Sequence, residues 1–465
     1  MKSKPSHPNI LFLLTDQQRA DTMESYGNSF IKTPHFNALA ESSFVFENAY
    51  CTQPVCTPSR ASILTGLWPH THGCIDNNMP LPEATTAIAE LLKSAPHKEY
   101  DYHCGYFGKW HLGDEIIRQR SFDEWRSVED AIYRPFYSKP EYLERRSDYH
   151  HFLVNNGYTP ENQSEDGALV FSRNWCTHLP LEHSKPSFLA QEAEAFITNR
   201  SSEQPWFLSV SFLEPHSPFS GPLDDLHDPD KMPLQDSFGK SPEENSARQK
   251  KISAQKCREI YSTEDELRQV KGRYYGLVSL VDQAVGRILK ALEDSEMGDD
   301  TIVIFTSDHG EMMGSHSCIH KSIMYEEAIR IPWLIRVPWL TPRRINGKVS
   351  QIDFLPTLLG LLGLPAPNHL QGENRLSVLE GSQTLDDNDV FVEWNPSTWR
   401  TIISREGWKL SLSPNDAGEF FDLNDDPCEM QNRFSDPTCI EKINLLKCRL
   451  RDWQETTNDS AILPT

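Results

Sequence analysis

Several short runs of the sequence are apolar at nearly every position, and they cover residues 9–15, 102–107, 206–212, 301–307 and 331–337. Short runs without polar alternation are typical of strands covered on both faces, as in a parallel sheet. Apolar residues recur at helical spacing between these runs, and helices are expected at 33–46 (with a short strand at its end), 186–199, 274–293 and 353–362. Alternating strands and helices predict an α/β fold with a mostly parallel central sheet flanked by helices.

The pattern changes near the C-terminus. After a Pro- and Asn-rich stretch at 365–368, short alternating runs at 390–394, 401–404 and 408–412 are followed by a helical pattern over 440–454. Alternation is typical of antiparallel strands with one buried face. We therefore expect a catalytic domain over 1–375 and a smaller C-terminal α+β unit over 376–465 that carries an antiparallel sheet.

Composition limits the classes of function. Of 465 residues, 38% are hydrophobic and 10% aromatic, which is typical of a globular protein. The net charge of −22 argues against general attraction to nucleic acid or to an anionic membrane. No apolar run approaches the roughly 18 residues of a membrane span. The ten cysteines are scattered without a CxxC pair, as expected of reduced thiols. The expected location is the cytoplasm, unless a leader has been removed.

Charged and titratable residues follow four of the apolar runs. In chain order these residues are Asp16, Lys109 with His111, His216, and Asp308 with His309. In an open α/β sheet, ligands bind outside the carboxyl ends of the strands. We therefore expect these side chains to meet at one edge of the sheet.

The stretch Cys51–Gly66 adds a cysteine to this edge. Pro58 suits the first turn of a helix and Gly66 can end it. Cys56 would then lie at the helix N-terminus, where free N–H groups favour an anion, with Arg60 one turn further on. A lone cysteine in such a place is most often structural.

The wider motif is more specific. Cys56-x-Pro-Ser-Arg60 followed by Ala-Ser-Ile-Leu-Thr-Gly66 resembles the signature of the formylglycine-dependent sulfatases of the alkaline phosphatase superfamily. The stretches Gly108–His111, Pro215–Phe219 and Asp308–Gly310 resemble further motifs of that family. The resemblance implies an alkaline-phosphatase-like fold and hydrolysis of a sulfate monoester of a carbohydrate or other small alcohol. It also implies that a formylglycine-generating enzyme oxidises Cys56 to formylglycine, whose hydrated aldehyde is the nucleophile.

The resemblance assigns roles to the remaining motif residues. It implies one divalent metal, Ca²⁺ first and Mg²⁺ or Mn²⁺ as alternatives, held by Asp16, Gln17, modified Cys56, Asp308 and His309. Many relatives carry a second aspartate where this chain has Gln17. The implied catalytic residues are Cys56, Arg60, Lys109, His111, His216 and Lys321, and the implied sulfate contacts are Asn77, Lys109, His216 and Lys321. His70 and His72 have the spacing of a metal-binding pair, but we expect them to stabilise their loop.

Two alternatives remain open. A phosphonate monoester hydrolase or phosphodiesterase of the same superfamily is favoured by Gln17 and His309, whereas the pair Lys109 and His111 argues against it. A catalytically inactive binding protein is disfavoured by the complete set of metal and anion residues. Specificity for the alcohol is expected in residues 114–205 and 221–269, and in C-terminal residues such as Trp399 and Arg400.

Overall fold

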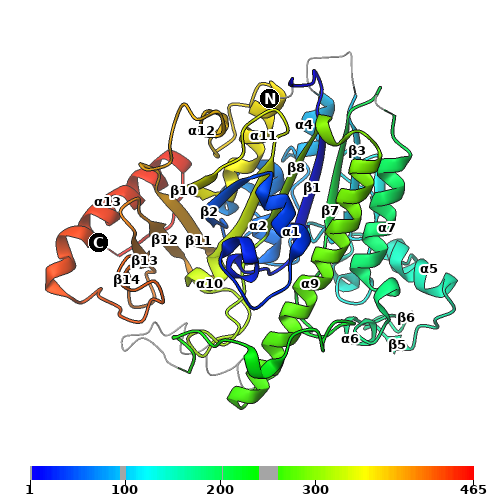
Figure 1. Cartoon of the computed structure of the whole chain (residues 1–465). Helices are drawn as coiled ribbons and strands as arrows, with labels where there is room; N and C mark the ends of the chain where they lie inside the picture. The colour runs from blue at the N-terminus through cyan, green and yellow to red at the C-terminus, as the bar shows by residue number, and fades with distance from the viewer. Residues whose placement is uncertain (1–2, 95–100, 202, 240–259, 465) are drawn as a thin grey trace.

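A computed structural model describes residues 3–94, 101–201, 203–239 and 260–464. Its central sheet has eight strands in the order β10-β2-β9-β8-β1-β7-β3-β4 (Figure 1). These strands are β1 (Asn9–Thr15), β2 (Phe44–Tyr50), β3 (His103–Gly108), β4 (Glu124–Arg126), β7 (Trp206–Ser211), β8 (Thr301–Ser307), β9 (Arg330–Arg336) and β10 (Arg344–Ser350). A separate two-stranded ribbon pairs β5 (Asn162–Gln163) with β6 (Leu169–Val170).

Strand direction confirms the predicted mostly parallel sheet. Within this sheet, β9 is antiparallel to both of its neighbours, β2 and β8, and the other adjacent pairs are parallel. The central strand β1 is buried along its whole length. Because both faces of β1 are covered, its sequence is apolar at each position from Ile10 to Leu14.

Helices cover both faces of the sheet. The helices of the described residues are α1 (Pro34–Glu41), α2 (Cys56–Thr65), α3 (Pro69–His72), α4 (Ile88–Ser94), α5 (Asp148–Asn155), α6 (Arg173–Cys176), α7 (Lys185–Thr198), α9 (Glu264–Asp294), α10 (Glu326–Ile329), α11 (Phe354–Leu362), α12 (Leu376–Glu380) and α13 (Ile440–Thr457).

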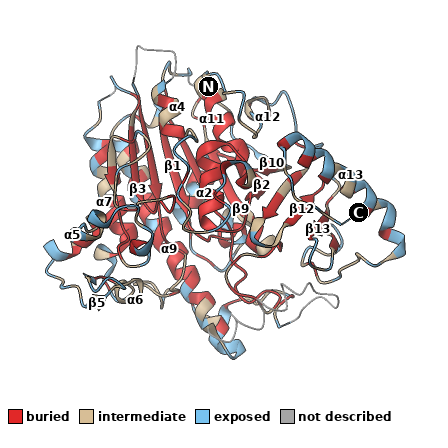
Figure 2. Ribbon diagram, turned by 180° about the vertical axis from the view of Figure 1, so that it is seen from behind, coloured by how far each residue is buried: buried red, intermediate tan, exposed pale blue. Residues whose placement is uncertain are grey.

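Alternate residues of β1 enter two separate cores because successive strand side chains point to opposite faces. Phe12 stacks on Phe354 of α11 with ring centroids 4.6 Å apart. Leu11 and Leu13 belong to the core on the other face, where α7 and α9 pack. Figure 2 shows these central strands buried between the helix layers.

The long helix α9 begins earlier than its apolar stripe suggested. Residues 264–269, at the end of the polar segment 221–269, form the first turns of α9. Thr263 accepts a hydrogen bond from the backbone N–H of Glu266, and the Glu266 carboxylate accepts one from Thr263 N–H, a capping box that starts the helix. Residues 240–259 of this segment lie outside the described part of the chain.

The C-terminal region confirms the predicted antiparallel sheet. Its strands are β11 (Val390–Trp394), β12 (Trp399–Ile403), β13 (Trp408–Leu412) and β14 (Glu419–Asp422), paired in sequence order. Apolar residues of β12 and β13 form a core with Leu446 and Leu450 of α13. The exact division at residue 375 stays a prediction. Among the described residues, no helix is both long and apolar enough to cross a membrane.

Candidate active site

Four neighbouring strands deliver the predicted site residues to one edge of the sheet. The strands β8, β1, β7 and β3 are adjacent and parallel, so their carboxyl ends lie side by side. Asp308 and Asp16 follow β8 and β1, and both carboxylates are fully buried. Lys109, directly after β3, donates a hydrogen bond to Asp16. The predicted convergence at this edge is therefore present in the fold.

Helix α2 brings Cys56 and Arg60 to the same edge. It begins at Cys56 itself, with Val55 as its N-cap. Gly66 ends it with a left-handed backbone (φ 67°) that favours glycine. The Arg60 Nε donates to Asp308 at 2.8 Å, and its Nη2 lies 3.4 Å from Asp16 Oδ2. Arg60 thus bridges the two carboxylates.

The thiol of Cys56 lies at the centre of this cluster. Its Sγ is 3.3 Å from His309 Nε2, 3.5 Å from Lys321 Nζ and 3.6 Å from Asp16 Oδ1. Burial and the Asp16 carboxylate oppose ionisation of the thiol, but Lys109 and Lys321 outweigh them and lower its pKa to about 7. Because the helix N-terminus also favours negative charge, this position suits an oxygen or sulfur nucleophile.

The surrounding donor atoms fit a divalent cation. Ligand atoms of Asp16, Cys56, Asp308 and His309 all lie within 4.8 Å of one another. Two buried carboxylates give the hard oxygen donors that Ca²⁺ and Mg²⁺ prefer, and one imidazole is compatible with Mn²⁺. The residues present therefore fit the expected metal.

Two neighbours fix the side-chain amide of Gln17. Lys321 is a donor only, and its Nζ donates to Gln17 Oε1. Glu311, fully buried, accepts a hydrogen bond from Gln17 Nε2. Burial opposes ionisation of Glu311, but its contact with His320 lowers its pKa, so the carboxylate can only accept. Both contacts therefore turn the amide oxygen of Gln17 towards Lys321, and Lys321 in turn reaches Cys56. The sequence motifs assign no role to Glu311.

The end of β3 is shaped by glycine and a buried glutamate. Gly108 has φ 107°, and a Cβ there would lie 1.9 Å from the carbonyl oxygen of Ser211, so no other residue fits. The Glu115 carboxylate accepts from the backbone N–H groups of Trp110 and His111 at 2.8 Å each. These contacts hold the loop that carries Lys109. No sequence motif had pointed to Glu115.

The ring of His111 is a neutral imidazole. Burial, followed by the charges of Lys109 and Arg60, holds its pKa well below the usual range. Its Nε2 lies 2.9 Å from Asn78 Oδ1, which can only accept a hydrogen bond. With the ring proton placed there, Nδ1 carries a lone pair, and it has no hydrogen-bond partner among the described residues. His111 can therefore accept a proton at Nδ1.

The last two predicted residues of the site are His216 and Asn77. The Nδ1 of His216 lies 2.7 Å from the carbonyl oxygen of Ser217. Burial, followed by the charge of Lys321, holds the pKa of His216 well below its usual value. Asn77 Oδ1 accepts from the backbone N–H of Thr57 at 3.1 Å, in the first turn of α2. Asn77 thus lies beside Cys56, and its Nδ2 makes no hydrogen bond to a described residue.

His70 and His72 do not share a ligand site. His72 Nε2 lies 3.2 Å from Ser62 Oγ, and its Nδ1 accepts from Cys74 N–H at 3.1 Å. His70 faces the C-terminal unit, where its Nδ1 is 3.0 Å from Glu393. Each ring therefore joins its loop to a different neighbour.

Arg400 was expected to contact the substrate, but its side chain is buried in the C-terminal unit. It is 2% exposed, and its guanidinium binds Asp459 at 2.7 Å and Glu393 at 3.4 Å. Trp399 is buried as well. Arg400 is held there by Asp459, which follows α13, and Trp399 belongs to the apolar core that β11 shares with the central sheet.

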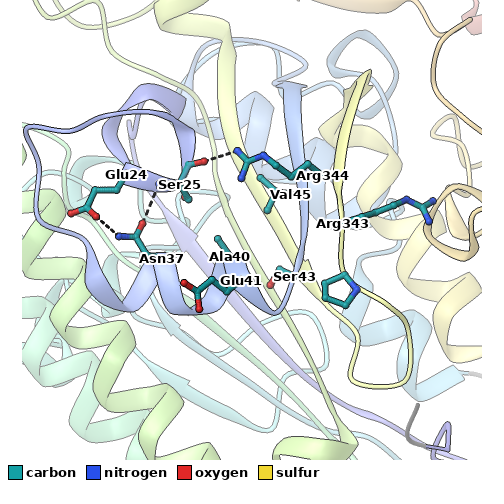
Figure 3. Close-up of a pocket in the computed structure, with 10 residues that line it drawn as sticks. Glu24, Ser25, Asn37, Ala40, Glu41, Ser43, Val45, Arg343 and Arg344 are labelled. Atoms are coloured by element: carbon teal, nitrogen blue, oxygen red, sulfur yellow. Dashed lines mark hydrogen bonds between the residues drawn. The ribbon is translucent and has the colours of Figure 1, made fainter.

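A large surface groove elsewhere is separate from this cluster. It has a volume of about 460 Å³ and is lined by Glu24, Asn37, Val45 and Arg344, among others (Figure 3). Val45 and Arg344 lie at the starts of β2 and β10, whereas Cys56 follows the end of β2. Glu24 and Asn37 bind each other at 2.6 Å, so these polar groups are paired within the groove.

The fold and this cluster define a class of protein: a hydrolase with an alkaline-phosphatase-like fold and a buried cluster of side chains that fits a divalent metal. Comparisons with known proteins agree. The sulfatase family model matches residues 8–364, and the model for the C-terminal region of N-sulphoglucosamine sulphohydrolase matches residues 314–456. The chain belongs to the sulfatase family, and it is a sulfuric ester hydrolase.

Individual relatives resemble the chain over nearly its whole length. An arylsulfatase of Clostridium perfringens is 29% identical over 95% of this chain and 93% of its own. An ulvan-active sulfatase of Formosa agariphila is 27% identical over 97% of this chain and 81% of its own. Among solved structures, the phosphonate monoester hydrolase of Agrobacterium radiobacter superposes with a TM-score of 0.78 at 23% identity, covering 97% and 96% of the two chains. BT4656 in complex with its substrate D-glucosamine-2-N,6-O-disulfate superposes with a TM-score of 0.76 at 23% identity, covering 98% and 99%.

Proposed function

We propose that this protein hydrolyses the sulfate monoester of a carbohydrate or other small alcohol, with Cys56 converted to formylglycine by a formylglycine-generating enzyme. The observation that carries the proposal is the position of Cys56. Its Sγ lies at a helix N-terminus, 3.3 Å from His309 and 3.5 Å from Lys321. A hydroxyl of the hydrated aldehyde placed there would face both a metal ligand and a cation.

The metal would be held by Asp16, Gln17, Asp308 and His309, together with the modified side chain at position 56. We expect Ca²⁺, because three of these protein ligands are oxygens. When bound, such a cation lowers the pKa of a coordinated hydroxyl and neutralises charge on the sulfate oxygens. The hydrated aldehyde supplies one hydroxyl as the nucleophile and a second whose deprotonation releases sulfate.

The cationic side chains hold the charges of the substrate. A sulfate ester presents negatively charged oxygens that shield the sulfur from attack, so charge must be neutralised by preorganised groups. Lys109, Lys321 and Arg60 all lie within contact of the Asp16, Asp308 and Cys56 cluster. We assign sulfate binding to Lys109, Lys321, His216 and the free amide of Asn77, and the positioning of the carboxylates to Arg60.

Protons move through the histidines and Lys321. His111, neutral and with Nδ1 unpartnered among the described residues, is assigned as the base that deprotonates the second hydroxyl. Lys321 or His216 protonates the leaving oxygen. His216 is neutral because burial and Lys321 lower its pKa. It therefore serves as the acid only once the negative charge of a bound sulfate has raised that pKa.

The second candidate is phosphonate monoester hydrolysis on the same scaffold. It is favoured by Gln17 and His309 in the metal site, and the structural likeness to phosphonate monoester hydrolases shows that the fold accommodates it. Lys109 and His111 argue for sulfate, because that group of enzymes typically carries neutral hydroxyl residues at the two positions.

The test compares two substrates on one metal-loaded preparation. We expect kcat/KM for 4-nitrophenyl sulfate to exceed kcat/KM for the matching phenylphosphonate monoester. A higher value for the phosphonate would assign the chain to the second function. The Asp308→Asn variant is the control, since loss of one anionic ligand should lower metal content and activity together. Activity towards neither ester, and towards no member of a panel of sulfated sugars, in fully modified, metal-loaded protein would indicate a binding protein.

A further inference from the structure

A small, partly open cavity lies directly beside the proposed catalytic residue His216. It is lined by Arg173, Lys185, Glu214 and His216, with apolar side chains of α9 behind them. Its volume is about 30 Å³, which is room for roughly two water-sized groups. Neither the sulfatase motifs nor the reaction described above uses Arg173, Lys185 or Glu214.

The charges around this cavity balance. Glu129, 3% exposed, accepts hydrogen bonds from Arg173 Nε at 2.7 Å and from Lys185 Nζ. One carboxylate is thus shared by two cations. Glu214 supplies a second carboxylate, so the four groups are neutral together when Glu214 is ionised. The surroundings therefore match an uncharged ligand better than an ion.

One donor and one acceptor remain unused at the cavity. Arg173 donates through Nε to Glu129 and through Nη2 to Tyr133 at 2.9 Å, but its Nη1 makes no hydrogen bond to any described residue. The Oε2 atom of Glu214 is buried and likewise has no partner in the described part of the chain. Burial raises the pKa of Glu214 to about 7. Buried polar atoms normally have partners, so this acceptor is free to take a hydrogen bond from a group bound in the cavity.

The cavity is connected to the reaction centre on two sides. His216 lines it directly. On the other side, Arg173 lies over the ring of Tyr133 at 5.6 Å, and Tyr133 packs on His111 with ring centroids 4.6 Å apart. A group bound between Arg173 and Glu214 would therefore lie beside His216, the residue assigned above to the sulfate and the leaving oxygen.

We propose that this cavity is a subsite for hydroxyl groups of the substrate, bound between Arg173 and Glu214, and that the substrate is the sulfate ester of a polyhydroxy alcohol such as a sugar. A hydroxyl both donates and accepts, and it therefore satisfies Glu214 and Arg173 at once. A carboxylate would face Glu214, and a quaternary ammonium would face Arg173 and Lys185. Aryl rings offer no donor. This inference rests on the proposed function.

The test is a specificity ratio: kcat/KM for the best member of a panel of monosaccharide monosulfates, divided by kcat/KM for 4-nitrophenyl sulfate. The wild-type protein should favour the sugar. In Glu214→Gln, which keeps the side-chain size but removes the charge, the ratio should fall about 10- to 100-fold, as expected for the loss of a hydrogen bond to a charged group. The matched control is Glu182→Gln, an exposed glutamate, which should keep the wild-type ratio.

A second variant covers the case in which Glu214→Gln folds poorly. Arg173→Lys keeps the charge beside Glu129 but removes the free Nη1 donor, and it should lower the same ratio.

The inference is overturned if no monosaccharide sulfate is a better substrate than 4-nitrophenyl sulfate. It is also overturned if both variants slow the two substrates equally. Should the protein prefer phosphonate esters, the proposed function fails, and the ratio is measured with sugar and 4-nitrophenyl esters of phenylphosphonate. This second ratio tests the subsite independently of the proposed function.

Discussion

Gln17 shows how one side chain is matched to its surroundings in this site. Relatives often carry an aspartate at this position, which would bring a second negative charge. Here Glu311 already supplies a buried carboxylate, and the neutral amide donates to it through Nε2 while Oε1 accepts from Lys321. A carboxylate at position 17 would instead lie in direct contact with the Glu311 carboxylate, and like charges in a buried site disfavour each other.

The contact between Gln17 and Glu311 predicts how exchanging the charges of the two side chains affects stability. Gln17→Glu should lower the Tm of the metal-free protein, because it places two buried carboxylates in contact. Glu311→Gln should also be harmful, since two amide nitrogens would then meet. The double variant restores one donor facing one acceptor and should recover stability, with a coupling of about 1–3 kcal/mol. Strictly additive losses in the double variant would show that Glu311 does not orient Gln17.

At the residue level, the sequence motifs predicted which side chains gather at the sheet edge. Asp16, Cys56, Arg60, Lys109, Asp308 and Lys321 contact one another as a group. Glu311, Glu115 and Asn78 were not assigned roles. Each acts through a hydrogen bond to a neighbouring loop, and such contacts produce no recognisable pattern of residue spacing in the sequence. Arg173 and Glu214 were missed for the same reason.

At the level of elements, apolar runs predicted strands and helices well because burial on both faces requires continuous apolar sequence. Three features could not be predicted this way. The direction of β9 depends on how the chain returns after β8, and the start of α9 depends on the capping box at Thr263, which precedes any apolar stripe. The turn after α2 is a third case, since His72 binds Ser62 of α2 and Cys74 beyond α3.

The buried His72 predicts how stability depends on pH. Burial lowers its pKa in the folded protein to about 3, whereas the unfolded chain protonates near 6.5. The stabilising effect is therefore complete above about pH 6.5 and is lost as the pH falls from there towards about 3. Between about pH 7.5 and about pH 5.5 this group alone should cost roughly 1 kcal/mol.

The measurement is Tm against pH for wild type and His72→Asn, whose amide oxygen can still accept from Cys74 N–H. The decrease in Tm on acidification should be smaller in the variant, whatever its absolute Tm. Parallel curves for the two proteins would contradict the assignment.

For the whole molecule, a buried ion network joins the C-terminal unit to the site. Glu393 of β11 donates its backbone N–H to Thr52 O at 2.8 Å, in the loop that leads to Cys56. Its carboxylate contacts His70 and Arg400, and Arg400 also binds Asp459 after α13. The sequence predicted the antiparallel sheet of this unit but not its function as a support for the Cys56 loop. Contacts between distant segments are not visible in a local pattern.

This network predicts that Arg400→Leu is strongly destabilising. It would leave Glu393 and Asp459 as buried carboxylates without their main partner, which typically costs about 3–5 kcal/mol. Urea unfolding would measure the loss. The matched control is Arg433→Leu in the same unit, which breaks an exposed pair with Asp436 and should change stability little. Equal effects of the two substitutions would refute a structural role for the buried network.

The central claim is that this chain cleaves sulfate esters through a formylglycine at position 56, and one measurement tests it most directly. Preparations made with different amounts of a formylglycine-generating enzyme are digested, and mass spectrometry quantifies the fraction of the Cys56 peptide that has lost its sulfur. Specific activity towards 4-nitrophenyl sulfate should rise in proportion to that fraction and approach zero when Cys56 is wholly unmodified. Full activity with an intact Cys56 thiol would contradict the account.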